Sequence, residues 1–361
     1  MVQIHKLVAP SSQGSIPMKL NILATAVLLT PLCLAAGAKA ANPDHVKQLL
    51  NTNACIKCDL TNVDLMGANL KGANLEGANL KNANLKDANL EGANLKGAIL
   101  QDATLRGAQL VGVNLEGVNL INSRLDGAQL VGVNLEGVKL VNAKMAGINL
   151  KGANLKNVQL RGANLGGANL EGANLSGADL NLHDGTFTYL GFANLKKADL
   201  SNAKLRASWL MGANLEGANL SGADLGSDSY RKGEEKISVY TNLNGVNLKD
   251  ANLSGVHLNR AFLVNANLSA ANLSGADLEL VDLEDANLSG ANLSNAGLNK
   301  AFLRNANLSG ANLKSARIVN VNLKSANLSG AKLESADFKG SNLCGVTMPD
   351  GSKSQQGCEQ T

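Results

Sequence analysis

Aromatic residues and proline are scarce in this chain. Phe, Trp and Tyr make up 2% of its 361 residues, and there are only 5 prolines. An ordinary domain of this length fills its core with many more large rings, so this core must use small, uniform side chains. An excess of charge is also missing, with 33 basic against 29 acidic residues. On charge alone, this balance excludes a strongly basic nucleic-acid binder and an acidic mimic of DNA.

The first 40 residues differ from the rest, because they hold three lysines and no acidic residue. An apolar run over 22–36 follows a basic start near Met18, which is an alternative initiation site, and Ala38-Lys39-Ala40 follows the run. This pattern predicts a secretory signal peptide over 1–40, cleaved after Ala40. A membrane anchor is the alternative, but the run is short for a span of about 20 residues.

Leucine recurs at every fifth position over most of the chain. Steps of five give Leu at 32 of 34 positions from 60 to 225, and at 19 of 21 from 243 to 343. A small residue, mostly Ala, stands two positions before each Leu, and Asn or Asp stands between them. A period of five fits neither a helix nor a continuous strand. It predicts short strands separated by turns, with the Leu and the small residue on the inward face.

Longer internal repeats indicate how many pentapeptides make one coil. Residues 108–122 recur at 128–142 with 13 of 15 identical, and 259–273 recur at 299–313 with 12 of 15 identical. Offsets of 20 and 40 predict a structural unit of 20 residues, which is four pentapeptides per coil.

These repeats resemble the pentapeptide-repeat family, whose consensus is A-(N/D)-L-x-x, over about three quarters of the chain. The resemblance implies an all-β fold, a right-handed quadrilateral parallel β-helix (a solenoid) with Leu and the small residue inward. The chain ends and the cysteines are similar to secreted cyanobacterial members, which implies export to the periplasm or the thylakoid lumen. Some members of the family mimic DNA and inhibit a DNA-binding enzyme. That alternative is disfavoured here by the near-neutral charge and the predicted signal peptide.

The repeats fall into two blocks, 58–227 and 241–345, and the open β-edges at their ends need covers. Asn42-Pro43-Asp44 predicts the start of a helix over 43–52, since Asn can cap and Pro suits the first turn. We expect this helix to lie over the first coil within a capping segment 41–57, with Val46, Leu49 and Leu50 as its apolar face and His45 at the surface. Pro349-Asp350-Gly351 predicts a turn in a C-terminal cap over 346–361.

Four cysteines remain after the predicted signal peptide: Cys55, Cys58, Cys344 and Cys358. They allow three pairings, but a stack of coils separates the first two from the last two by far more than the about 7 Å that a disulfide permits. We therefore expect Cys55–Cys58 and Cys344–Cys358 bridges in an oxidising compartment. A thioredoxin-like redox site at Cys55 and Cys58 is the alternative, but the βαβ unit that accompanies such a motif is absent. Metal binding by these two thiols with His45 is a third alternative.

Two segments interrupt the repeat. Segment 181–189 keeps the five-residue count, so we expect two degenerate repeats there. Segment 226–242 changes the register and must protrude, and its composition predicts a small hairpin in a loop over 228–240.

Six of the nine aromatic residues lie between 187 and 240, and exposed rings are preferred anchors at interfaces. Tyr189 and Trp209 are one coil apart, and we expect their rings to stack on one face. The alternative is that the rings only cover the breaks in the repeat. Phe262 and Phe302 form a weaker candidate on a face of their own. The predicted interaction residues are Phe187, Tyr189, Trp209, Tyr230 and Tyr240.

Motifs for catalysis are not found. His183-Asp184 has no nucleophile placed beside it by a known motif, and there is no phosphate loop or dinucleotide fingerprint. We therefore expect no enzyme activity, cofactor or metal. The sequence predicts an exported, non-catalytic scaffold that binds another protein, with no nucleic-acid partner and no membrane span after signal cleavage.

Overall fold

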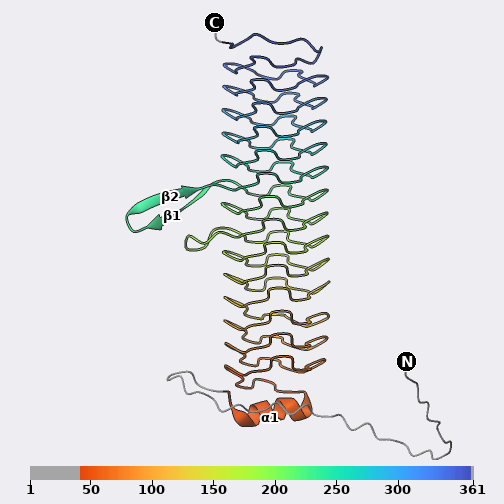
Figure 1. Cartoon of the computed structure of the whole chain (residues 1–361), viewed down its shortest axis with the longest axis vertical. Coiled ribbons are helices and arrows are strands. Elements are labelled where there is room, and N and C mark those ends of the chain that lie inside the picture. Colours follow the sequence, from red (N-terminus) through yellow and green to blue (C-terminus); the bar gives the residue numbers. More distant parts are fainter. Residues whose placement is uncertain (1–40, 359–361) are drawn as a thin grey trace, which may run out of the picture. The chain divides into compact units, whose positions relative to one another are not determined.

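The repeats wind into a stack of coils that follows one short helix (Figure 1). This structure is a computed structural model that describes residues 41–358. Within each pentapeptide the Leu and the small residue two positions earlier are buried; Leu165 and Ala163 are both 0% exposed. The residue between them points outward, as strand geometry requires. The buried residues form one continuous core from Leu49 to Val346.

Hydrogen bonds between coils hold the stack together. Outward residues pair in parallel with residues 20 positions further on, from Ala54 with Asn74 to Asn327 with Thr347. The N–H of Leu75 donates to the carbonyl of Asn94, and the N–H of Asn94 donates to the carbonyl of Ala73, both at 2.8 Å. Each coil thus satisfies backbone groups of the coils before and after it.

The turn after each Leu explains two further features of the repeat. The second residue after Leu has a left-handed backbone, with φ of 66° at Gly72 and 58° at Asn82. Gly and Asn tolerate this conformation best. The Asn before each Leu closes the turn: the Oδ1 of Asn84 accepts the N–H of Lys86 at 3.2 Å, which is an Asx turn.

The bridged outward residues form four columns, each of which defines a wall. The first asparagine wall runs from Asn69 through Gln109, Asn169 and Asn247 to Asn327, and the second from Asn74 through Asn154 and Asn252 to Asn312. The charged wall includes Asp179, Lys204, Asp224, His257 and Asp277. The aromatic wall holds, in order, Arg124, Lys144, Asn164, Tyr189, Trp209, Asn242, Phe262, Asp282 and Phe302.

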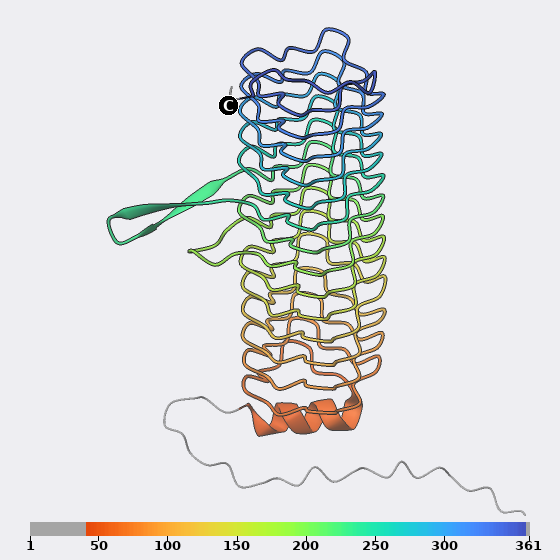
Figure 2. The same cartoon turned by 45° about the horizontal axis from the view of Figure 1, so that its top comes forward.

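Two insertions leave the stack at the corner between the charged wall and the aromatic wall. Asn164 pairs with Tyr189, 25 positions on, and Trp209 pairs with Asn242, 33 positions on. The second insertion is an antiparallel hairpin of β1 (Asp228–Lys232) and β2 (Glu235–Val239). The first is a loop over 181–187, so the expectation of two degenerate repeats in the wall is wrong. Both project on the same side of the stack (Figures 1 and 2).

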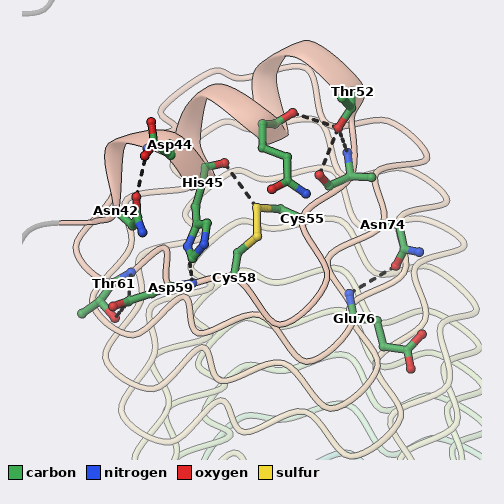
Figure 3. Close-up of a disulfide and its surroundings, with 12 residues drawn as sticks. Asn42, Asp44, His45, Thr52, Cys55, Cys58, Asp59, Thr61, Asn74 and Glu76 are labelled. Atoms are coloured by element: carbon green, nitrogen blue, oxygen red, sulfur yellow. Dashed lines mark hydrogen bonds between the residues drawn. A yellow bond between two sulfur atoms is a disulfide. The ribbon is translucent and has the colours of Figure 1, made fainter.

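Helix α1 (Pro43–Thr52) lies at the N-terminal end of the coils (Figure 3). Asn42 caps it by accepting the N–H of Asp44 at 3.0 Å. Leu49 is buried, but Leu50 is 56% exposed, so Leu50 does not belong to the packed face as expected. His45 is partly buried rather than a plain surface residue, because its Nδ1 accepts the N–H of Asp59 at 3.0 Å and ties the helix to the first coil.

Both ends carry a disulfide. Cys55 bonds to Cys58 with a Cα–Cα distance of 5.4 Å, and Cys344 to Cys358 with 4.8 Å. The Sγ of Cys55 lies 3.2 Å from the carbonyl oxygen of His45, which is a packing contact because a disulfide sulfur has no proton to donate. At the C-terminal end, residues 352–356 run back along 343–348.

The predicted signal peptide, 1–40, lies outside the described residues. Among residues 41–358, no helix is long and apolar enough to cross a membrane.

A candidate protein-interaction face

Buried hydroxyls anchor the two insertions. Thr188, Ser208 and Thr241 occupy the inward slot that is usually Ala, and all three are 0% exposed. The Oγ1 of Thr188 accepts the N–H of Gly162 at 3.0 Å, and Thr241 donates to the carbonyl of Gly226 at 3.0 Å. These hydroxyls bond to backbone groups at the points where the chain leaves the regular ladder. Within the repeats, Thr occupies this slot at 188 and 241 and nowhere else, which is a sequence signal that the period of five does not reveal.

Arg206 links the beginnings of the two insertions. Its side-chain Nε lies 2.5 Å from the Oδ2 of Asp224, which precedes the hairpin. Its backbone N–H donates to the Oδ1 of Asn181, at the start of the loop, at 3.0 Å. The hydrogen bond and charge of Asp224 raise the pKa of Arg206. The loop and the hairpin therefore share one fixed base.

The hairpin also touches the loop directly. A Cβ at Gly185 would lie 3.0 Å from the ring of Tyr230, and the φ of Gly185 is 77°. Only glycine fits there without strain. Since side chains alternate along a strand, the hairpin face with Tyr230 and Ile237 turns towards the loop. Tyr230 is thus a contact between the insertions rather than a free ring.

An apolar recess of about 230 Å³ lies between the insertions and the aromatic wall. The ring of Trp209 packs on Phe187 at a centroid distance of 4.8 Å, and the ring of Tyr240 meets Phe262 edge to face at 5.7 Å. The recess is lined by Phe187, Trp209, Ser238, Val239, Tyr240, Asn242 and Phe262. Three of the five predicted interaction residues therefore gather at one site.

A second, wider hollow of about 570 Å³ lies beside the loop at the level of Asn164. Tyr189 lines it together with Lys144 and Phe187. A Cβ at Gly166 would lie 2.7 Å from the Tyr189 ring, so this ring packs against the coil below. Tyr189 and Trp209 are bridged neighbours as expected, but the ring packed on Trp209 is that of Phe187.

The two candidate faces in the sequence are one face in the structure. Phe262 and Phe302 stand in the same column as Tyr189 and Trp209, and they are 38% and 44% exposed. The hairpin hides this continuity, because its length is not a multiple of five and it shifts the register between Trp209 and Asn242.

Two exposed residues were not among the predicted interaction residues. Phe192 is 66% exposed and Met211 is 41% exposed, and each follows a Leu of the aromatic wall. Phe192 occupies the left-handed turn position with a φ of 58°. A bulky residue in that conformation is strained, and such strain is often retained at functional sites.

Charge changes along the aromatic wall. Arg124 and Lys144 are bridged neighbours below the loop, whereas Asp282 stands above Phe262. Burial, together with the nearby carboxylates of Glu284 and Asp285, raises the pKa of Asp282, although the N–H of Glu284 opposes this by donating to its Oδ1. Between Arg124 and Asp282 the wall therefore changes from cationic through aromatic to acidic.

The other titratable residues that the sequence analysis singled out are His183 with Asp184, and the two cysteines beneath α1. His183 lies 3.6 Å from Asp184 in the loop. Between residues 41 and 358, no group of three or more His, Cys, Asp and Glu side chains could hold a metal ion. Cys55 and Cys58 are 0% and 4% exposed beneath α1, which restricts access to their disulfide and disfavours a role in thiol exchange.

Three solved structures with similar chains are of pentapeptide repeat proteins. HetL, from the cyanobacterium Nostoc sp. strain PCC 7120 and involved in heterocyst differentiation regulation, is 26% identical; the match covers 88% of this chain and 100% of HetL, with a TM-score of 0.22. Rfr23 from the cyanobacterium Cyanothece 51142 is 34% identical over 38% of this chain and 86% of its own, with a TM-score of 0.17. A protein from the Arabidopsis thaliana thylakoid lumen is 28% identical over 32% of this chain and 70% of its own, with a TM-score of 0.15. No curated protein sequence matches the chain significantly.

The sequence profile of the family described as pentapeptide repeats matches the chain in eight copies, which together cover more than half of it. The matched residues are 58–97, 98–137, 134–172, 153–184, 188–226, 247–285, 286–324 and 320–348. Members of this family fold as right-handed quadrilateral β-helices and are generally non-catalytic structural or interaction proteins. The chain belongs to the pentapeptide-repeat family.

Proposed function

We propose that this protein is an exported, non-catalytic scaffold that binds another protein through the insertion corner. The observation that carries the proposal is the apolar recess where Phe187, Trp209 and Tyr240 converge with Phe262. Aromatic side chains in such recesses are the residues that most often dominate binding energy. The asparagine walls, by contrast, are polar and well solvated.

Export is proposed from the signal-like sequence of residues 1–40 and from the two disulfides, which persist in oxidising compartments such as the periplasm. The thylakoid lumen is the other compartment proposed. We also propose that four pentapeptides make one coil of the solenoid and that α1 caps the first coil. The bond of His45 to Asp59 and the burial of Leu49 support the capping role. A cap there would cover an open β-edge that invites aggregation.

Crosslinking and pull-down from the exported fraction test the proposal. The bait is the whole protein, compared with a variant that lacks residues 228–240 and with Trp209→Ala. Removing these 13 residues restores the 20-residue spacing between Trp209 and the next outward residue, so the coil can still close. We expect both changes to lose the captured protein, with a loss of about tenfold or more for Trp209→Ala.

Val111→Ala is the matched control, because Val111 is also an exposed apolar residue, at 41%, but stands beside the first asparagine wall. It should capture as much protein as the unmodified chain. Capture that survives both the hairpin deletion and Trp209→Ala would contradict binding at the insertion corner.

A further inference from the structure

The aromatic wall is self-complementary about Trp209. We propose that it binds a second copy of this chain, with the two solenoids antiparallel and related by a twofold axis that crosses the interface at Trp209. This inference names the partner of the face described above, and so rests on the proposed protein-binding function. Homodimers of this kind use the same patch twice, so each residue above the axis must suit the one equally far below it.

The charges meet this requirement. Lys144 is three bridged steps below Trp209, through Asn164 and Tyr189. Asp282 is three bridged steps above it, through Asn242 and Phe262. At about 4.8 Å per step, each charge lies about 14 Å from the axis, so Lys144 of one copy faces Asp282 of the other. Neither side chain forms an ion pair with another residue in the range 41–358.

The same charges exclude the parallel arrangement. A twofold axis along the stack would place Lys144 opposite Lys144 and Asp282 opposite Asp282. Like charges in apposition oppose association. Only the antiparallel pair brings opposite charges together, and it does so twice in each dimer.

The shape of the wall follows the same symmetry. The hollow of about 570 Å³ is centred on the level of Asn164, two steps below Trp209. Phe262 stands two steps above Trp209 and is 38% exposed. The antiparallel pair therefore presents the outer part of Phe262 to the hollow of the second copy, which supplies Phe187 and Tyr189 as apolar contacts.

Small residues below the axis also match large residues above it. Ala146 and Gly147 follow Lys144 in the chain, and Glu284 and Asp285 stand at the equivalent places after Asp282. One step from the axis the sizes are reversed: Phe192 is large and strained, and its counterpart is Gly245. A Cβ at Gly245 would meet no atom of the described residues within 4 Å, so there is room for the ring.

Exposed apolar residues lie at the centre. Trp209 and Met211 are 40% and 41% exposed, and the axis places each beside its own copy. Met is adaptable and makes favourable contacts with rings. An apolar centre with charged pairs at its margins is the usual arrangement of a protein interface.

The size of the wall sets the expected affinity. From Arg124 to Phe302 there are eight bridged steps, about 40 Å at the strand spacing of about 4.8 Å, and a face three residues across adds about 10 Å. The resulting footprint is below the about 800 Å² per partner of a standard interface. We therefore expect a concentration-dependent dimer with a Kd of about 1–10 μM.

Charge exchange tests the inference directly, by sedimentation velocity on the purified protein over a concentration series. The variants are Lys144→Asp, Asp282→Lys and the double exchange of both. Each single change places like charges together twice per dimer, and we expect it to weaken the dimer about tenfold or more. The double exchange restores opposite charges and should return the dimer to near its original affinity. Lys139→Asp, an exposed lysine in the charged wall, should leave the dimer unchanged.

The outcomes separate this inference from the proposed function. A protein that stays monomeric up to about 100 μM, well above the expected Kd, overturns the homodimer. So does a dimer that both single changes leave intact, or one that the double exchange does not restore. If the protein is monomeric but Trp209→Ala still abolishes capture of another protein, the scaffold function stands and only the homodimer fails. If the charge exchanges behave as expected but the unmodified chain captures no other protein, the homodimer stands and only the binding of another protein fails.

Discussion

The asparagine walls and the aromatic wall are built on the same backbone but present opposite kinds of surface. On the asparagine walls, one residue type repeats at nearly every level and its amides bond from coil to coil, as in the 3.1 Å bond from Asn267 to Asn247. Lysines and glutamates pair beside them across coils, for example Lys71 with Glu91 at 2.9 Å. On the aromatic wall, cations, rings and carboxylates succeed one another. A wall of uniform side chains stabilises the stack of coils, whereas a wall of varied side chains can distinguish one binding partner from another.

The small inward residues should be packed equally tightly behind both kinds of wall. Replacing such an Ala with the larger Leu tests this, and it has the largest expected effect on stability. Ala163 lies behind the aromatic wall and Ala168 behind the first asparagine wall, and both are 0% exposed. Ala163→Leu and Ala168→Leu should each lower the free energy of unfolding by about 1–3 kcal/mol, because a well-packed core has no room for added methylenes. Denaturant unfolding measures both.

The exposed Lys151→Ala is the control and should cost less than about 0.5 kcal/mol. If one alanine tolerated Leu and the other did not, the walls would differ in their cores as well as on their surfaces.

Outward residues should differ between the walls. Asn169 accepts the N–H of Glu171 and exchanges amide bonds with Asn149 and Asn194, all at 3.3 Å. Asn169→Ala removes the hydrogen bond that closes the turn and the two amide bonds to the neighbouring coils. We therefore expect the free energy of unfolding to fall by about 1–2 kcal/mol, with no loss of binding.

Phe302→Ala on the aromatic wall should show the opposite result, with stability changed by less than about 0.5 kcal/mol and weaker association. Thermal unfolding and sedimentation on both variants provide the comparison. Equal losses of stability at the two positions would show that the aromatic wall is also a structural wall.

The difference between the walls also explains what the sequence could predict. The period of five identifies the inward pair without ambiguity, because every coil repeats the same requirement. The Asn-Pro-Asp signal predicts a helix over 43–52, where the structure has α1, and the change of register marks the hairpin. These features depend on interactions between residues close in the sequence, so a short stretch of sequence is enough to predict each of them.

The site was harder to predict, because it depends on which coils are neighbours. The loop over 181–187 adds one whole period and so leaves no change of register to detect. The hairpin insertion is not a whole number of pentapeptides long, so counting in fives does not place Phe262 in the same column as Trp209. Thr188 and Thr241 in the small slot were the available signal. Each ends an insertion, and its hydroxyl bonds to a backbone carbonyl at the start of that insertion, Thr188 to Asn181 and Thr241 to Gly226.

Phe192 has a left-handed backbone conformation, which lowers the stability of the fold at this position of the aromatic wall. The same turn position is held by Gly at the next two levels of the wall, Gly212 and Gly245, and by Asn or Asp at others, such as Asn265 and Asp285. Phe192→Gly should raise the free energy of unfolding by about 1 kcal/mol, since a side chain in this conformation costs about 1–2 kcal/mol and glycine's added freedom in the unfolded chain offsets part of the gain.

The same change should weaken self-association, because it removes the most exposed ring of the wall. Denaturant unfolding at low concentration and sedimentation at high concentration separate the two effects. A variant that is both less stable and fully associated would show that Phe192 is a structural residue.

Asp282 offers the smallest and most discriminating test, because its effect on stability should depend on pH and on protein concentration. Burial raises the pKa of this carboxyl above its unfolded value of about 3.9. The folded state therefore binds the proton more tightly than the unfolded state, and ionisation of Asp282 destabilises the isolated fold. Asp282→Asn keeps an oxygen that can accept the N–H of Glu284, so it should stabilise the monomer at pH 7. The advantage should shrink as the pH falls through the raised pKa and vanish below the unfolded value.

In the proposed dimer, however, Lys144 of the second copy stabilises the ionised carboxylate of Asp282, so Asp282→Asn should then weaken association. Unfolding measured at pH 7 below and above the dimer Kd should show the benefit of Asn only in the dilute sample. A benefit of equal size at both concentrations would mean that no cation faces Asp282, and the antiparallel register would be wrong.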